Sequence, residues 1–314
     1  MQFTHQHILS VNQFTQEGVE HLFQFAHRMR PIEQHIVRCQ VLDGYILGSF
    51  FFEASTRTRM SFETAFMRLG GLVNTTTGFT FSSMAKGESL EDTIRVAQGY
   101  CDIIVMRHPD VGSAELASRH STKPVINGGD GPGEHPTQAL LDLFTIREEK
   151  KRIEGITIAM IGDLKHGRTV HSLTKLLTLY RGITIQLIAP EEVQMQKELI
   201  AYLRANGCEV MQSEHLEDCL PTADILYVTR IQKERFSDTE AYDRVNGTYS
   251  IDRALIEKYC KSDITIMHPL PRLGELACDI DDHPGAAYFR QAENGTLVRM
   301  ALFILVLGKE NKFV

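Results

Sequence analysis

Seven short apolar runs alternate with segments of helical length along this chain, and this alternation constrains the fold more than any other feature. The runs are rich in Ile, Val and Phe, and they are YILGSFFF (45–52), CDIIVMR (101–107), KPVIN (123–127), ITIAMIGD (156–163), GITIQLIAP (182–190), ADILYVTR (223–230) and DITIMHPLP (263–271). Near-continuous apolar strands separated by helices indicate parallel sheets that are covered on both faces. The sequence therefore predicts an α/β fold.

The segments between these runs predict helices at 58–69, 89–100, 137–150, 168–180, 191–206 and 288–308. A chain of 314 residues exceeds the size that a single core usually serves, so we expect two domains that share one cleft. Residues 128–136, GGDGPGEHP, mark the break between the two sheets. The last helix could pack on either half; we assign 1–136 plus 288–314 to one domain and 137–287 to the other.

Composition and charge exclude several classes of protein. The net charge is −7 and the basic residues are scattered, so no nucleic-acid footprint is expected. The N-terminal MQFTHQHILS lacks a basic region followed by an apolar run, and no 18-residue uncharged apolar stretch follows, so we expect a cytoplasmic protein without a membrane partner. Six cysteines without a CxxC pair argue against a zinc or redox motif.

Residues 51–60, FFEASTRTRM, place hydroxyl and guanidinium groups in the first turn of a predicted helix. The unpaired N–H groups of such a turn favour an anion. Arg57 and Arg59 oppose the helix dipole unless something negative binds beside them. An ordinary cap made by Ser55 or Thr56, with solvated arginines, is the alternative, but the whole cluster favours a phosphate site.

Two polar positions follow strands or turns of the same predicted sheet. Arg107 and His108 end the run CDIIVMR, where an arginine can reach an anion at the neighbouring helix. Alternatively, Arg107 is an ordinary surface charge that binds no ligand. His135 directly precedes Pro136, which suits the first turn of a helix. A capping role remains open for His135, but a neutral imidazole there could donate to an oxygen that gains charge during acyl-type transfer.

The second half of the chain has arginines at two corresponding places. Residues 162–169 nearly match the nucleotide-binding pattern GxxxxGKS/T, but Arg168 replaces the lysine and the loop is bulky. Arg168 therefore fits better as a bidentate partner of a carboxylate. Arg230 ends the run ADILYVTR and would lie at the same sheet edge, which suits a ligand with two carboxylates. A solvated loop is the alternative for Arg230.

Two further segments are uninformative by themselves. Lys86 lies in a polar loop, FSSMAKGESLEDT (81–93), and HPLPR (268–272) forms a rigid turn that would expose the Leu270 carbonyl. Together with FFEASTRTR, VMRHP, GDGPGEHPTQALLDLFTI, GDLKHGRTVHSL and YVTRIQKER, however, these stretches resemble the aspartate/ornithine carbamoyltransferase family over nearly the whole chain. QKER and HPLPR resemble its aspartate-using branch, because the ornithine branch typically has a cysteine where Pro269 stands.

The resemblance implies a role for each matching residue. The residues implied to bind carbamoyl phosphate are Ser55, Thr56, Arg57, Thr58, Arg107, His135, Gln138, Leu270, Pro271, Ser82 and Lys86. Among them, Arg57, Thr58, Arg107 and His135 are implied to be catalytic. The residues implied to bind L-aspartate are Lys86, Arg168, Arg230 and Gln232. Glu53 is implied to pair across the domains with Arg168 and Arg235.

The family implies direct attack of the aspartate amine on the carbamoyl carbon, without a covalent intermediate, metal or organic cofactor. It also implies a homotrimer with shared sites, in which the loop with Ser82 and Lys86 comes from the adjacent subunit. Separate regulatory chains are left open by the sequence. The alternatives are a carbamoyltransferase for another amine, such as ornithine, and a non-catalytic trimeric homologue.

Overall fold

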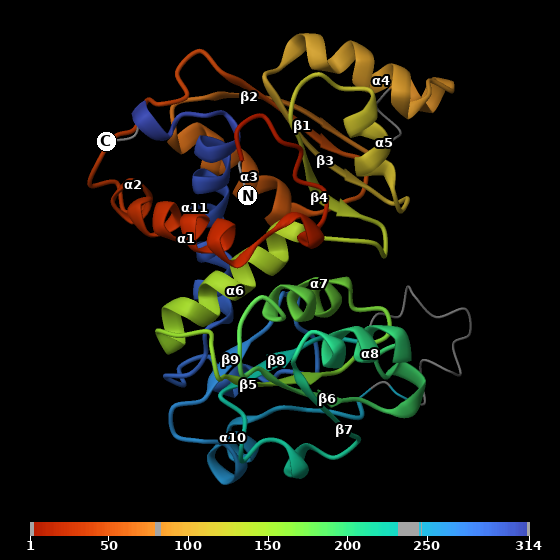
Figure 1. Ribbon diagram of the computed structural model, residues 1–314, viewed down its shortest axis with the longest axis vertical. Coiled ribbons are helices and arrows are strands. Elements are labelled where there is room, and N and C mark those ends of the chain that lie inside the picture. Colours follow the sequence, from red (N-terminus) through yellow and green to blue (C-terminus); the bar gives the residue numbers. More distant parts are fainter. Residues whose placement is uncertain (1–2, 79–82, 232–244, 246, 313–314) are drawn as a thin grey trace. The chain divides into compact units, whose positions relative to one another are not determined.

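The computed structural model describes residues 3–78, 83–231, 245 and 247–312 (Figure 1). The chain forms two compact units, Met1–Leu141 with Glu293–Val314, and Asp142–Ala292. Each unit contains one parallel sheet with helices packed on it. The predicted α/β fold class is therefore confirmed. The assignment of 1–136 plus 288–314 and 137–287 to two substrate-binding domains stays a prediction.

The sheet of the first unit has the strand order β2-β1-β3-β4, and neighbouring strands are parallel. Its strands are β1 (Ile46–Phe51), β2 (Leu72–Thr77), β3 (Ile103–His108) and β4 (Val125–Asp130). The helices of this part of the chain are α1 (Gln16–Arg28), α2 (Arg30–Glu33), α3 (Thr56–Arg68), α4 (Leu90–Ala97) and α5 (Ser113–Arg119). Two longer helices, α6 (Pro136–Lys150) and α11 (Tyr288–Val306), include residues of both units.

Alternation along β1 explains why its end is so rich in phenylalanine. Phe50 and Phe52 belong to the apolar cluster that α4 and α5 form on one face of the sheet. On α3, Phe62 and Phe66 meet Phe303 of α11 edge-on, at ring distances of 5.9 and 4.9 Å. Figure 1 shows α4 and α5 on one side of this sheet and α3 on the other. Both faces of β1 are thus covered.

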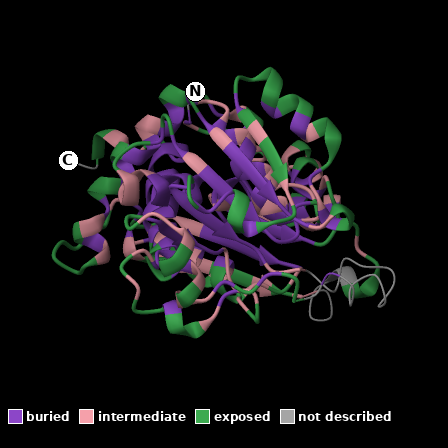
Figure 2. Cartoon of the chain, turned by 90° about the horizontal axis from the view of Figure 1, so that it is seen from below, coloured by how far each residue is buried: buried purple, intermediate pink, exposed green. Residues whose placement is uncertain are grey.

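The sheet of the second unit has the order β7-β6-β5-β8-β9, again parallel throughout. Its strands are β5 (Thr157–Ile161), β6 (Thr184–Ile188), β7 (Glu209–Ser213), β8 (Ile225–Val228) and β9 (Thr265–Met267). The helices between them are α7 (Arg168–Leu177), α8 (Lys197–Ala205) and α10 (Arg253–Tyr259), and Figure 1 shows α10 on the opposite side of the sheet from α7 and α8. Buried residues concentrate in the strands (Figure 2).

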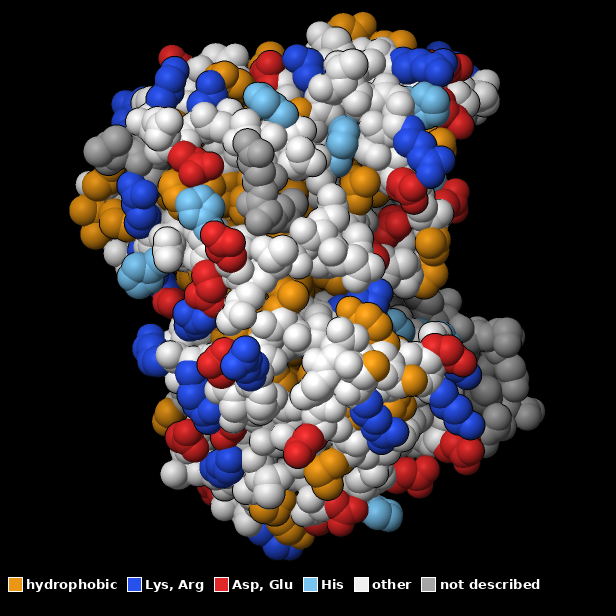
Figure 3. All heavy atoms as spheres, viewed as in Figure 1, with side chains coloured by type: hydrophobic (Ala, Val, Ile, Leu, Met, Phe, Trp, Pro, Cys, Tyr) orange, Lys and Arg blue, Asp and Glu red, His pale blue; other side chains and the backbone are white. Residues whose placement is uncertain are grey.

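The surface and the cysteines have the character of an ordinary globular chain. On the face drawn in Figure 3, acidic and basic side chains are interspersed. All six cysteines are free. Burial is the main factor that raises the pKa of the Cys101 thiol to about 11, so this buried thiol stays protonated and unreactive near neutral pH.

Candidate active site

The first turn of α3 differs from the starts of α1 and α4. Helices α1 and α4 begin with side-chain caps from Thr15 and Ser89 and have acidic residues in their first turns. In α3 the N-cap residue Ser55 is extended, its side chain makes no capping hydrogen bond, and no acidic residue follows in the first turn. The positive end of this helix therefore lacks the usual compensation from the chain itself.

The residues of this turn present two kinds of donor. Thr56 and Arg57 are exposed, Thr58 is buried, and Arg59 is half-buried and donates its N–H to the Ser55 carbonyl at 3.2 Å. Partial burial lowers the pKa of the Arg57 guanidinium from its ordinary value, but an arginine remains charged at neutral pH. Backbone N–H groups, hydroxyls and a guanidinium thus meet at one helix start, which is a suitable site for a phosphate.

Arg107 lies next to the connection between β1 and α3. It pairs in register with Phe51, and its carbonyl accepts the Phe52 N–H at 2.8 Å. Its Nε lies 3.2 Å from Oε2 of Glu53, and its Nη1 donates to the Gly128 carbonyl at 3.3 Å. The side chain is only 9% exposed, so Glu53 and Gly128 hold this cation beside the connection that leads into α3.

His108, at the end of the same strand, is a packed residue. Its Nδ1 accepts the Asp110 N–H at 3.1 Å, and its ring meets Phe52 edge-on at 5.6 Å. Desolvation by burial lowers the pKa of this imidazole more than the nearby carboxylates raise it. His108 is therefore neutral at neutral pH and contributes packing.

The glycine-rich loop after β4 is organised by one buried carboxylate. Asp130 accepts hydrogen bonds from the N–H of Gly112 at 2.9 Å, the N–H of Glu134 at 2.7 Å and the side-chain amide of Asn127 at 3.2 Å. Its exposed fraction is 7%. These bonds tie the loop to the start of α5 and fix the segment that leads into α6.

Gly131 is required in this loop for steric reasons. Its φ is +51°, and an added Cβ would lie 2.1 Å from the Pro109 carbonyl oxygen. The loop ends at His135, whose carbonyl accepts the N–H groups of Gln138 at 3.0 Å and Ala139 at 3.2 Å as α6 begins. His135 itself is buried, with 4% of its surface exposed. The loop thus sets the position of His135 at the start of α6.

In the second unit, Arg168 is the first residue of α7. The preceding Gly167 provides no side-chain cap, and no acidic residue occurs in the first turn. The loop before it is closed by Asp163, which accepts the His166 N–H at 3.0 Å and lies 3.1 Å from its Nδ1. Because the chain's own side chains fill this loop, it does not resemble an open phosphate-binding loop.

Arg230 follows β8 at the corresponding end of the neighbouring strand. The Thr229 N–H donates to the Ile161 carbonyl at 2.8 Å, so β8 and β5 end side by side. Gly162 has a φ of +112°, and an added Cβ would lie 2.1 Å from the Thr229 carbonyl oxygen. This close approach brings the loop that precedes Arg168 against the residue that precedes Arg230. Both arginines lie at the carboxyl edge of the second sheet and are half-buried.

The turn after β9 is held by His268. Nδ1 of His268 accepts the Leu270 N–H at 2.8 Å, and Nε2 lies 2.9 Å from Oε1 of Glu275. Burial would raise the pKa of Glu275, but hydrogen bonds from His268 and backbone N–H groups outweigh it and lower this pKa. Leu270 has a φ of +55° and precedes a cis peptide bond to Pro271. Leu270 is half-buried and Pro271 is exposed.

The remaining predicted site residues lie in several different elements. Lys86 ends a 3-10 helix, Ser83–Lys86, and is exposed, and Gln138 lies half-buried in the first turn of α6. Glu53 pairs with Arg107 in the first unit, while its predicted partners are in the second. Three predicted residues lie outside the described residues: Ser82, Gln232 and Arg235.

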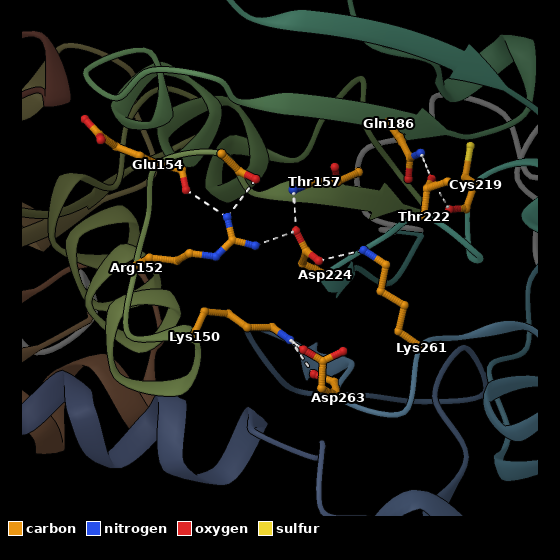
Figure 4. A network of polar contacts seen from close by, with 11 residues as sticks. Lys150, Arg152, Glu154, Thr157, Gln186, Cys219, Thr222, Asp224, Lys261 and Asp263 are labelled. Atoms are coloured by element: carbon orange, nitrogen blue, oxygen red, sulfur yellow. Dashed lines mark hydrogen bonds and ion pairs between the residues drawn. The ribbon is translucent and has the colours of Figure 1, made fainter.

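A second polar network lies at the opposite edge of the second sheet, where strands begin (Figure 4). Asp224 accepts the Thr157 N–H at 2.9 Å and pairs with Lys261 at 2.7 Å and Arg152 at 3.4 Å. Burial alone would raise the pKa of Asp224, but the bonds from Lys261 and Thr157 lower it overall. This network is distant along the strands from Arg168 and Arg230 and joins strand starts.

The described residues contain neither a cluster of metal-ligating side chains nor a helix that could span a membrane. Residues 3–78, 83–231, 245 and 247–312 contain no group of three or more His, Cys, Asp or Glu side chains that could hold a metal ion. Within the same ranges, no helix combines the length and the hydrophobicity needed to cross a bilayer.

Both halves of the chain match protein-family models. The model "Aspartate/ornithine carbamoyltransferase, carbamoyl-P binding domain" matches residues 6–148. The model "Aspartate/ornithine carbamoyltransferase, Asp/Orn binding domain" matches residues 154–306. The two matches together cover nearly all of the chain.

Individual proteins match over nearly the whole length. The aspartate carbamoyltransferase catalytic subunit of Dichelobacter nodosus is 53% identical over 312 residues, which are 96% of this chain and 89% of that protein. The catalytic subunit of M. jannaschii aspartate transcarbamoylase has a TM-score of 0.90 and 47% identity, with 98% of this chain and 99% of that one covered. Aspartate transcarbamoylase from Trypanosoma cruzi, solved in complex with carbamoyl phosphate and aspartate, has a TM-score of 0.92 and 40% identity, over 97% and 98% of the two chains.

Proposed function

Because this chain belongs to the aspartate/ornithine carbamoyltransferase family, we propose that it transfers the carbamoyl group of carbamoyl phosphate to the amine of L-aspartate. The products are N-carbamoyl-L-aspartate and phosphate, and the reaction serves pyrimidine biosynthesis. The observation that carries this proposal is the first turn of α3, where Arg57 and Thr58 stand at a helix start without a side-chain cap or an acidic residue.

Carbamoyl phosphate binds at this turn. Its phosphate is held by Ser55, Thr56 and Arg57 together with Arg107, whose guanidinium lies at the adjacent strand end. Thr58, Arg107 and His135 donate to the carbamoyl oxygen. Gln138 and the carbonyl oxygens of Leu270 and Pro271 accept from the carbamoyl amide. The order of β1 and β3 supports the phosphate part of this assignment, because it places Arg107 next to the residue that leads into α3.

L-aspartate binds through its two carboxylates to Arg168, Arg230, Gln232 and Lys86. The adjacent ends of β5 and β8 support the pairing of the two arginines on one ligand. Planar guanidinium groups suit carboxylates because they donate two parallel hydrogen bonds. An acceptor with a second amine, such as ornithine, would meet like charge at the same place, which makes aspartate the better substrate.

The reaction is a direct transfer. The uncharged amine of aspartate attacks the carbamoyl carbon, a tetrahedral oxyanion forms, and the phosphate leaves with the amine proton. Holding two substrates in line supplies about 7–11 kcal/mol of the barrier, and each well-placed oxyanion donor supplies about 3–4 kcal/mol. The chain therefore contributes by holding the two substrates in position and by providing fixed positive charge. No organic cofactor or metal is assigned to it.

The active unit is a cytoplasmic homotrimer in which each site takes Ser82 and Lys86 from the adjacent subunit. The exposed position of Lys86 in its own subunit is consistent with a role beyond that subunit. Mixing inactive Arg57→Ala chains with inactive Lys86→Ala chains tests this sharing. After random reassembly about one quarter of the sites regain both residues, so about a quarter of the normal activity should return.

The matched control replaces the Lys86→Ala chain by one that carries both substitutions, because no mixture can then contain an intact site. If the first mixture stayed as inactive as the control, sites would lie within single chains. Calorimetric titration with N-(phosphonacetyl)-L-aspartic acid tests ligand binding separately. Tight binding by the natural sequence and weak binding by Arg57→Ala are expected; no binding by either would favour a non-catalytic homologue.

A further inference from the structure

A line of buried hydrogen bonds crosses the second unit. The Tyr227 hydroxyl donates to Oδ2 of Asp142 at 2.7 Å, and Nε2 of Gln291 donates to Oδ1 of Asp142 at 2.6 Å. Tyr227 and Asp142 are 0% exposed and Gln291 is 1% exposed. Polar groups at such depth are stable only when they are hydrogen-bonded, so each member depends on the others.

The orientation of the Gln291 amide is fixed at both ends. Its Oε1 accepts the backbone N–H of His268 at 2.9 Å, while its amide nitrogen faces the Asp142 carboxyl group. A reversed amide would place donor against donor at His268 and acceptor against acceptor at Asp142. Every donor and acceptor of the line is therefore fixed: the Tyr227 hydroxyl and the Gln291 amide both donate to Asp142, and the His268 N–H donates to Gln291. We call this line the Asp142–Gln291 link.

The two ends of the link lead to proposed substrate contacts. At one end, Tyr227 lies in β8, three residues before Arg230, and its hydroxyl also hydrogen-bonds Thr169, the neighbour of Arg168. At the other end, His268 holds the N–H of Leu270 through its Nδ1. Gln138, a further proposed contact, precedes Asp142 by one turn of α6.

We propose that Asp142 and Gln291 are positioning residues for the transfer. The Asp142–Gln291 link joins the start of α7, the end of β8 and the turn after β9, so that Arg168, Arg230 and the Leu270 carbonyl keep a fixed spacing. This inference rests on the proposed function. Apolar side chains could hold the same elements together, but hydrogen bonds between fixed donors and acceptors hold them in one register. A misplacement of about 1 Å can cost about 10²-fold in rate.

A polarity swap tests the link. In Asp142→Asn the new amide nitrogen opposes either Tyr227 or the Gln291 amide, and in Gln291→Glu a carboxylate opposes Asp142. We expect each single change to lower kcat/KM for aspartate by about 10²-fold. KM for carbamoyl phosphate should rise less, because only its contacts with the turn after β9 depend on the link, whereas its phosphate contacts lie in the first unit.

The double variant Asp142→Asn, Gln291→Glu restores the hydrogen bonds of the link. The Asn oxygen accepts from Tyr227, its nitrogen donates to the new carboxylate, and that carboxylate accepts from His268. We expect kcat/KM within about tenfold of the natural value, which is a strong positive coupling in a double-mutant cycle. If the single variants fail to fold, the activity of the folded double variant alone tests the positioning role of the link.

Asp224→Asn is the matched control, because Asp224 is a hydrogen-bonded carboxylate of the same unit at the opposite ends of the strands. It should lower the melting temperature and leave kcat and both KM values within about twofold. The proposal is overturned if the double variant folds but is as impaired as the single ones, or if Asp142→Asn lowers only the melting temperature. An inactive natural enzyme, with both substrates saturating, would overturn the proposed function itself.

Discussion

Nε of Arg107 lies 3.2 Å from Oε2 of Glu53, and both side chains belong to the first unit. The carboxylate therefore screens the cation that is proposed to contact the phosphate. The family resemblance instead implies pairs of Glu53 with Arg168 and Arg235. Arg235 lies outside the described residues, and both of these pairs stay predictions.

Replacement of Glu53 by Gln keeps a hydrogen-bond acceptor next to Arg107 and removes the negative charge. The electrostatic potential at a bound dianion would then be more positive. KM for carbamoyl phosphate should therefore stay the same or fall by up to about threefold. Arg107→Ala, in contrast, should raise this KM by about 10²-fold. If Glu53 also pairs with Arg168, KM for aspartate rises. Steady-state kinetics with each substrate varied measure both KM values. An increase in KM for carbamoyl phosphate alone would contradict the proposed screening of Arg107 by Glu53.

Arg57→Ala should lower turnover at saturating substrates by about 10²–10³-fold, because it removes a donor that acts on the developing charge. Arg57→Lys should recover part of this loss, since lysine keeps the charge without the planar fork. Arg119→Ala is the control: this exposed arginine of α5 pairs with Glu115 one turn earlier. Near-normal turnover of Arg57→Ala in a phosphate-release assay would refute the assignment of the phosphate site.

Gly131→Ala should destabilise the fold and reduce turnover together. The added Cβ would collide with the Pro109 carbonyl in a left-handed backbone conformation, and the loop that sets His135 would shift. We expect the free energy of unfolding to fall by about 1–3 kcal/mol, as judged by urea denaturation. Gly99→Ala, where an added Cβ meets open space, is the matched control. Equal stability of the two variants would show that the loop adapts.

Asp224→Asn should reduce stability in a pH-dependent way. The pKa of Asp224 is lowered in the folded state, so its contribution is fully present above the ordinary pKa of 3.8 and is lost as the pH falls through the lowered value. The variant should be less stable than the natural protein by roughly 1–3 kcal/mol at neutral pH. Acid titration followed by circular dichroism should show this difference shrinking below about pH 4. A difference that stays constant into acid would contradict the assigned role.

Strands with apolar runs could be predicted from the sequence, whereas polar edge strands could not. Each of the seven predicted runs overlaps a strand. The two strands without such a run, β2 and β7, lie at sheet edges and are largely exposed, so selection for burial left no hydrophobic pattern in them. Helices α1, α2, α5 and α10 were also not predicted, and the predicted helix 191–206 begins only at Lys197 as α8.

Candidate site residues at strand ends could be predicted because parallel strands bring their carboxyl ends together. Asp130 was missed because its partners are mostly backbone N–H groups of irregular loops, which have no sequence pattern. The Asp142–Gln291 link was missed because it depends on contacts between residues that are far apart in the chain. Asp142 and Gln291 are 149 residues apart. A signal was present in ALLDLF (139–144), where one acidic residue interrupts an otherwise apolar stretch. An acid in such a place requires a buried partner.

The edge of the second sheet is proposed to select an amine that carries two carboxylates. The most direct test measures kcat/KM of the purified chain with carbamoyl phosphate and either L-aspartate or L-ornithine, with each carbamoylated product quantified. We expect kcat/KM with aspartate to exceed that with ornithine by at least about 10³-fold, because ornithine has only one carboxylate and adds an ammonium group near the arginines. Comparable rates with both amines, or faster carbamoylation of ornithine, would contradict it.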